Sequence, residues 1–334
     1  MNNKLIKVIA ETAWHHEGDF TFMKSLVKRI CASSADIVKL HITLDLDEYM
    51  SKDHENYAMQ KPWLLNEIQW DELIKIIRKS KKELLLLLND TKAIKFASKY
   101  DPEYVELHSV CLNVPRLNDA ILKYTNNSTI VIGVGGSTID EINEALKTFS
   151  LRKIILMFGF QNYPTKLENI NLHKVRKIQR LFPHCEFGYA DHTAWNHPDN
   201  QLISLLGAAN GMSYIEKHVT NNYGEQRCDF SAAISFDMFE NICKKINILN
   251  LILGDGDLAL NEGELNYSSN GPMKLAPCAT KNIDIGSNLK ESDFDFIRTS
   301  QVGNITQIQS KFFIGKRLTH SVEEGAILKT NYFE

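Results

Sequence analysis

The segments GYADHT (residues 188–193) and YIEKHVT (residues 214–220) decide the fold of this chain. Each begins with a short apolar run that is typical of a buried strand, and the runs lead to His192 and His218. Residues 198–210 between them have the pattern of a crossover helix, so the two histidines should lie side by side at one end of a parallel sheet. Neutral imidazoles in this arrangement form half of a divalent-metal site, and the alternative is a hydrogen-bonded pair at a strand edge.

The same alternation of strand and helix runs along most of the chain. Apolar runs predict eight strands, at residues 5–10, 36–41, 83–88, 103–107, 129–133, 153–158, 186–189 and 212–216. Eight such units predict a TIM (β/α)8 barrel of the α/β class, and a doubly wound sheet is the alternative. The barrel is favoured because polar residues gather at the C-terminal ends of the predicted strands, where a barrel carries its active site: Glu11, His41, Asn89, His108, Tyr163, His192 and His218.

The last quarter of the chain has a different pattern. We assign residues 1–255 to the barrel and residues 256–274 to a linker, because this stretch is rich in Gly, Asn, Ser and Asp and lacks apolar periodicity. Within residues 275–334, the segment 279–290 matches the segment 318–329 in register. This repeat predicts a small, pseudo-symmetric, β-rich domain.

Composition and charge indicate the class of protein. The chain has 334 residues, 43% of them hydrophobic, and a net charge of -3, which provides no basic surface for nucleic acid. No apolar run reaches the length of a membrane span, and the first nine residues lack the core of a signal peptide. The six cysteines form no CxxC pair, which favours reduced thiols. We therefore expect a cytoplasmic enzyme that binds neither nucleic acid nor membrane.

An ordered series of motifs resembles the N-acetylneuraminate (sialic acid) synthase family: IAE (9–11), HEGD (16–19), ADIVK (35–39), NYPT (162–165), NL (171–172), YADH (189–192), IEKH (215–218) and Thr220. Members of that family join a TIM barrel to a C-terminal domain similar to type III antifreeze protein (an SAF domain). They condense phosphoenolpyruvate with an N-acetylated amino sugar, use a divalent metal, and form domain-swapped homodimers. The resemblance therefore implies a carbohydrate-biosynthesis transferase with a small sugar substrate and Mn²⁺ or Mg²⁺.

The resemblance also implies roles for single residues. It assigns His192 and His218 to the metal and Glu11, Lys39 and Tyr163 to catalysis. The implied substrate contacts are Lys39, His41, Asn89, Ser109, Gln161, Tyr163, Asp229 and Arg298, the last delivered by the small domain to the partner's pocket. Without the resemblance, Lys39 is equally well interpreted as a surface lysine at the end of a strand. Tyr163 is equally well interpreted as a core ring whose hydroxyl reaches water.

The chain departs from the family where the phosphate of phosphoenolpyruvate binds. On the fourth strand the family has Lys-x-x-Ser-Gly-Glu, whereas this chain has Glu106 and Cys111 at the outer positions. Gly133 and Ala190 stand where the family has serines. A glutamate in place of a lysine about 4 Å from a phosphate turns an attraction of a few kcal/mol into a comparable repulsion. Phosphoenolpyruvate should therefore not bind as it does in the family, unless the backbone N–H groups of residues 133–136 bind the anion or the alignment of the fourth strand is slipped.

Three functions remain open. The chain is a synthase-like enzyme, a metal-dependent homologue with lyase, epimerase or hydrolase chemistry on an acidic or amino sugar, or a non-catalytic sugar-binding homologue. The retained metal pair argues against the third function. His41 and His108 either join the metal or line the pocket through hydrogen bonds, and Cys111 is either a nucleophile or an inert buried thiol.

Overall fold

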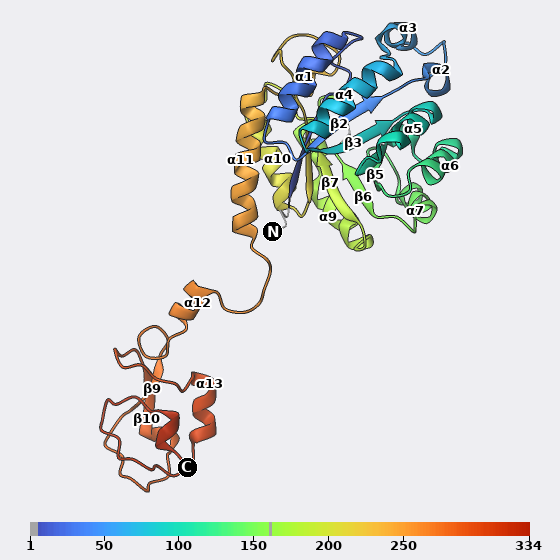
Figure 1. The fold of residues 1–334 in the computed structure, drawn as a ribbon. Coiled ribbons are helices and arrows are strands. Elements are labelled where there is room, and N and C mark those ends of the chain that lie inside the picture. The colour runs from blue at the N-terminus through green and yellow to red at the C-terminus, as the bar shows by residue number, and fades with distance from the viewer. Residues whose placement is uncertain (1–5, 160–161) are drawn as a thin grey trace. The chain divides into compact units, whose positions relative to one another are not determined.

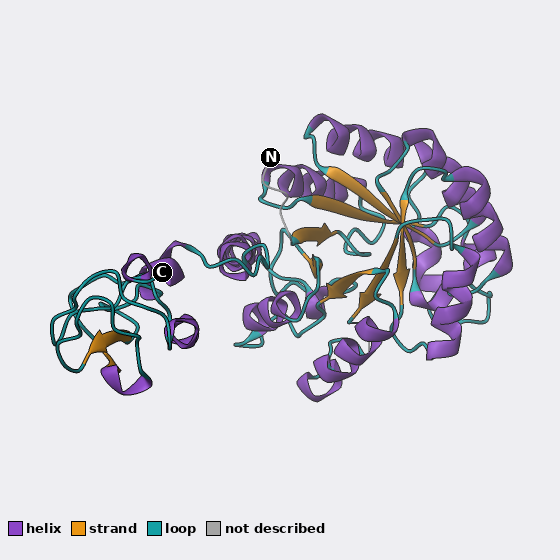
Figure 2. Ribbon diagram, turned by 90° about the horizontal axis from the view of Figure 1, so that it is seen from below, coloured by secondary structure: helices purple, strands orange, loops and turns teal. Residues whose placement is uncertain are grey.

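The computed structural model describes residues 6–159 and 162–334, and in this part of the chain eight parallel strands form a closed barrel (Figures 1 and 2). The strands follow one another around the barrel in chain order, and β1 pairs with β8 to close it. Each predicted strand overlaps an observed one, so the TIM-barrel prediction is confirmed and the doubly wound alternative is wrong. The strands are β1 (Lys7–Glu11), β2 (Ile37–Ile42), β3 (Glu83–Leu88), β4 (Tyr104–Leu107), β5 (Thr129–Gly133), β6 (Ile154–Phe158), β7 (Glu186–Ala190) and β8 (Tyr214–His218).

Helices surround these strands, as Figure 2 shows. Several begin at a side-chain cap: Asp19 accepts the N–H of Phe22 at the start of α1, and Thr138 forms a capping box with Glu141 at the start of α7. None of the helices in residues 6–159 and 162–334 combines the length and the apolarity needed to cross a membrane. The helices of the barrel are α1 (Phe20–Ala32), α2 (Leu46–Tyr49), α3 (Tyr57–Gln60), α4 (Glu67–Lys79), α5 (Thr91–Ala97), α6 (Pro115–Tyr124), α7 (Ile139–Thr148), α8 (Leu167–Ile170), α9 (Leu172–Leu181), α10 (Asn200–Ala209) and α11 (Phe236–Leu253).

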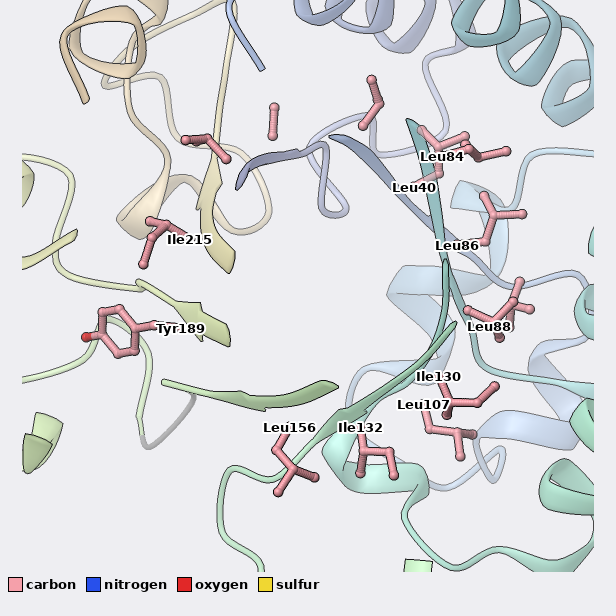
Figure 3. Close-up of a cluster of buried hydrophobic side chains, with 14 of the residues drawn as sticks. Leu40, Leu84, Leu86, Leu88, Leu107, Ile130, Ile132, Leu156, Tyr189 and Ile215 are labelled. Atoms are coloured by element: carbon pink, nitrogen blue, oxygen red, sulfur yellow. The ribbon is translucent and has the colours of Figure 1, made fainter. Parts of the chain in front are cut away.

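The strands carry side chains alternately outward and inward, which separates the core from the site. Leu40, Leu84, Leu86 and Leu88 belong to the outer core that packs against the helices (Figure 3). A second apolar cluster fills the barrel interior and includes Ile9, Ile37, Leu85, Val131 and Ile155. Two residues further along, the inward position is polar on β1, β2, β4 and β8, as in the step from Ile9 to Glu11 and from Ile37 to Lys39, whereas β3, β5 and β6 continue without a charged side chain. The period of two thus sets a polar layer above an apolar floor.

The chain divides into two compact units, Met1–Gly254 and Asp255–Glu334. The second unit contains α12 (Glu262–Tyr267), within the segment that we assigned to a linker, the antiparallel pair β9 (Ala276–Ala279) and β10 (Phe294–Ile297), and α13 (Gln307–Ser310). Equivalent positions of the sequence repeat pair with each other: Ile283 and Val322 exchange backbone hydrogen bonds of 2.8 and 2.9 Å. Both lie in a separate apolar core. The similarity of this unit to antifreeze protein stays a prediction.

Candidate functional site

A cavity of about 280 Å³ opens at the C-terminal ends of the barrel strands. Its lining draws residues from all eight strands and from the segments that follow them. Most of the predicted site residues lie in this lining: Glu11, Lys39, His41, Ser109, Tyr163, His192, His218 and Asp229. The same lining includes Glu106 and Glu216, which we had not assigned to the site.

The strongest electrostatic feature of the cavity is a buried lysine inside three carboxylates. The Nζ atom of Lys39 lies 3.2 Å from Glu11, 2.9 Å from Glu106 and 3.0 Å from Glu216. The four side chains are at most 5% exposed. Lys39 is therefore not a surface lysine. Its ammonium holds together carboxylates from β1, β4 and β8.

Burial and charge set the protonation of this cluster. Burial by itself lowers the pKa of Lys39, but the carboxylates of Glu106, Glu11 and Glu216 outweigh burial and raise it well above its ordinary value. Burial raises the pKa of Glu106 and raises that of Glu216 further, with Glu11 adding to both shifts. Burial opposes ionisation of Glu11 too, yet Lys39 and His218 hold the pKa of Glu11 well below its ordinary value. The cavity thus combines one carboxyl group that ionises readily with two that lose their protons less readily than an exposed glutamate does.

His192 and His218 meet as their positions on neighbouring strands predicted. Their ring centroids are 4.8 Å apart and the rings are almost perpendicular. The Nδ1 atom of His192 lies 3.0 Å from the carbonyl oxygen of Ala190, and because a carbonyl only accepts, Nδ1 carries the hydrogen and Nε2 keeps a lone pair. Burial lowers the pKa of His192 to about 3, so the ring is neutral. Gly159 permits this arrangement, since a Cβ there would lie 2.1 Å from the same carbonyl oxygen.

The donor set near these rings fits a divalent metal. His192, Glu216 and His218 each offer one ligand atom, and the three atoms lie within 4.8 Å of one another. A neutral imidazole with its other nitrogen bonded to a backbone carbonyl is the usual form of a metal-binding histidine. Among the described residues this is the one group of three or more with that spacing. His41 and His108 are therefore outside it.

Those two histidines form a neighbouring part of the wall. Their rings lie 6.1 Å apart and stack, and the side-chain nitrogen of Asn89 is 2.7 Å from Nε2 of His41. Burial lowers the pKa of His41 to about 3 and that of His108 to about 4. Both rings are neutral at physiological pH. The hydrogen-bonded lining that we considered for them agrees with this geometry.

The remaining predicted residues lie in different places. The Tyr163 hydroxyl donates to the backbone oxygen of Asp229, and it lies 3.3 Å from Nδ1 of His218. Asn89 is fully buried behind His41. Gln161 lies outside the described residues. Arg298 belongs to the second unit, where its guanidinium donates to the carbonyl of Pro272 at 2.8 and 3.1 Å.

The cysteine alternatives can also be compared with the structure. None of the six cysteines, all of which lie within residues 6–159 and 162–334, forms a disulfide. Cys111 is buried, and burial raises its pKa to about 11, so it remains a thiol at physiological pH. An inert thiol, rather than a nucleophile, fits this environment.

Sequence reasoning missed Glu216, although a signal for it exists. Glu216 precedes His218 by two residues on β8, and residues at this spacing face the same side of a strand. Applied to β8, the period of two places a carboxylate beside His218. Glu106 was noticed as the replacement of a family lysine, but its contact with Lys39 depends on how the barrel brings β4 close to β2, from which β3 separates it.

Comparisons with known proteins agree with this architecture. A profile of the NeuB family matches residues 26–258. An uncharacterized protein of Methanocaldococcus jannaschii is 25% identical over 96% of this chain and 92% of its own, and a pseudaminic acid synthase of Campylobacter jejuni is 23% identical over 99% of this chain and 97% of its own. The crystal structure of a putative spore coat polysaccharide biosynthesis protein E from Chromobacterium violaceum superposes with a TM-score of 0.83 at 17% identity, covering 98% of this chain and 99% of that one.

Proposed function

Because the chain belongs to the NeuB family, we propose that it is a metal-dependent enzyme of amino-sugar and sugar-acid metabolism that acts on a sugar carbonyl by epimerase- or lyase-type chemistry. One observation carries the choice of chemistry. The Lys39 ammonium is already enclosed by the carboxylates of Glu11, Glu106 and Glu216. Among the described lining residues, Lys39 is the sole lysine or arginine. A phosphoenolpyruvate anion entering this cavity would meet carboxylates, so the donor of the family's condensation is disfavoured.

His192, Glu216 and His218 would hold the metal. When bound, a divalent ion would act there as a Lewis acid that polarises the carbonyl oxygen of the substrate. Two imidazoles and one carboxylate suit Mn²⁺ or a softer first-row ion better than Mg²⁺, which prefers oxygen ligands and retains water.

The chain's own residues supply acid, base and orientation. Burial raises the pKa of Glu106, which faces the cavity, so this carboxyl group is placed to pass a proton to a substrate oxygen. Ionised Glu11 accepts from Nε2 of His218 at 3.1 Å and orients the ring. Lys39 stays an ammonium and is therefore not a Schiff-base nucleophile. Tyr163 and Asp229, at the wall of the cavity, are positioned to contact sugar hydroxyl groups.

Condensation with phosphoenolpyruvate is the second candidate. A relative named pseudaminic acid synthase aligns with 99% of this chain. Lys39 and Ser109, which the resemblance assigns to substrate binding, both line the cavity. These two observations keep the synthase reaction as the competing outcome of the same experiment.

The two candidates give different products. The protein, loaded with Mn²⁺, is incubated in D₂O with N-acetylmannosamine or N-acetylneuraminate, and with phosphoenolpyruvate in a parallel series. Proton NMR follows exchange at the carbon next to the carbonyl and the appearance of cleavage products, while a colorimetric assay follows phosphate. Deuterium incorporation or cleavage without phosphate release, absent in His192→Ala/His218→Ala and retained in the surface variant Lys7→Met, supports the proposal. Phosphate release that depends on the amino sugar overturns it in favour of condensation.

We also propose that the protein works as a domain-swapped homodimer. Large apolar side chains are exposed at the end of α11 and in the segment after it, including Leu251 at 81% and Leu258 at 97% exposed. A second copy that covers them would remove this surface from water. In such a dimer Arg298 of one copy would serve the barrel of the other.

A further inference from the structure

We propose that a buried ion pair between Asp191 and Lys217 positions His192 and His218 from outside the barrel. The inference rests on the metal site of the proposed function. Each member of the pair directly precedes one of the two histidines in the chain. Neither lies in the described lining of the cavity. The pair is thus placed to fix the histidines without touching a substrate.

Strand geometry puts both side chains in the outer layer. Tyr189 on β7 and Ile215 on β8 belong to the outer core, and Figure 3 shows both side chains among its residues. Asp191 and Lys217 lie two residues further along and share their faces. The Nζ atom of Lys217 is 3.3 Å from Oδ2 of Asp191, and both side chains are 0% exposed. The ion pair therefore joins β8 to the end of β7 on the side of the barrel that faces the helices.

The carboxylate of Asp191 controls the backbone at His192. Its Oδ1 atom accepts from the backbone N–H of Thr193 at 2.9 Å and from the hydroxyl of Thr193 at 2.6 Å. The bond to the backbone forms an Asx turn with His192 as its central residue. Oδ2 accepts from Ser204 on α10 at 2.6 Å. The orientation of this one carboxylate thus sets the backbone position from which the His192 side chain projects. Lys217 holds the carboxylate from the β8 side.

Stability alone does not account for the pair. A buried ion pair is on average no more stabilising than well-packed apolar side chains of the same volume. Apart from the ion pair, Nζ of Lys217 has no hydrogen-bond partner among the described residues. The ion pair instead fixes the relative position of the ends of β7 and β8. The backbone N–H of Asp191 also donates to the backbone oxygen of Glu216 at 3.0 Å, so main chain and side chain both join these two ends.

The test uses Lys217→Met, which keeps the length of the side chain and removes its charge, together with Asp191→Asn, Ser204→Ala and the double variant Asp191→Asn/Lys217→Met. Ile203→Ala, on α10 in the same layer, is the matched control, because it destabilises the packing without touching the pair. The metal-free readout is the tautomer of His192 by ¹⁵N NMR of histidine-labelled protein. The second readout is calorimetric titration with Mn²⁺.

We expect the unmodified chain to show the hydrogen on Nδ1 of His192 alone, and Lys217→Met to show a mixture of tautomers. The dissociation constant for Mn²⁺ should rise about tenfold or more in Lys217→Met. The double variant should recover thermal stability but not the affinity, and Ile203→Ala should lose stability while binding Mn²⁺ normally. If Lys217→Met does not fold, Ser204→Ala, which removes one bond to the same carboxylate, gives both readouts.

Two results separate the possible failures. A folded Lys217→Met or Ser204→Ala variant with one His192 tautomer and unchanged Mn²⁺ affinity overturns the positioning role. The unmodified chain could fail to bind Mn²⁺ while the His192 tautomer still changes in these variants. That result overturns the metal site of the proposed function and leaves the positioning of His192 in place.

Discussion

Replacing Lys39 by methionine removes the one cation that three buried carboxylates share. The Nζ atom lies 2.9 to 3.2 Å from Glu106, Glu216 and Glu11, and the lysine side chain is 3% exposed. Removing one partner of a buried ion pair costs about 3–5 kcal/mol, because the charge that remains has lost its compensation. Lys7→Met is the matched control: Lys7 pairs with Glu83 at 2.7 Å, but both side chains are about a third exposed, and such pairs contribute about 0–1 kcal/mol.

The penalty should depend on pH with a defined sign. Lys39 lowers the pKa of Glu11, Glu106 and Glu216, so its removal raises the pKa of all three in the folded protein. Between the ordinary pKa of a glutamate and these raised values, the folded state binds more protons than the unfolded state. The free energy of unfolding then falls as pH rises. The loss in Lys39→Met should therefore be largest near pH 8 and smaller near pH 5.5.

Tryptophan fluorescence during urea unfolding measures this effect on the barrel alone. All four tryptophans, Trp14, Trp63, Trp70 and Trp195, lie in the unit Met1–Gly254. We expect Lys39→Met to lose about 3–5 kcal/mol at pH 8 and Lys7→Met to lose less than about 1 kcal/mol at both pH values. Equal losses in the two variants, or a Lys39→Met loss that does not change with pH, would refute the reasoning.

The other predictions concern metal, donor and assembly. The His192→Ala/His218→Ala variant should lose its bound divalent metal in elemental analysis, and undiminished metal content would contradict the assignment. Phosphoenolpyruvate should bind weakly in calorimetry with metal present, and Glu106→Lys should strengthen binding about tenfold, or about 1.4 kcal/mol; tight binding by the unmodified chain, weakened or unchanged by Glu106→Lys, would show a donor site built from other residues. Sedimentation velocity should show a dimer, and Arg298→Ala should lower activity without changing its mass, whereas a fully active monomer would exclude the swapped arrangement.

The barrel and the meeting of His192 with His218 were accessible to sequence reasoning for a physical reason. Strands that follow one another across a helix lie next to each other in a barrel, so His192 and His218 had to meet at one rim. The environment of Lys39 was not accessible in this way. Its three partners come from β1, β4 and β8, and their convergence depends on the tilt and closure of the whole barrel. The meeting of Tyr163 with Asp229 depends on loop conformation, which no periodicity encodes.

The pairing of β1 with β8 also sets the order in which the site can be assembled. Glu11 stands opposite His218 in the register of these strands, so an acid near the start of the barrel acquires its partner only when the last strand arrives. At about 5–20 residues per second, a ribosome takes on the order of 10–40 s to synthesise the roughly two hundred residues between them. During that time β1 presents an unpaired edge, and Lys39 meets the carboxylates of β1 and β4 without that of β8. We therefore expect nascent barrels of this protein to depend on chaperones until β8 emerges, and then to complete the charged cluster and bring Glu216 and His218 beside His192 in a single late step.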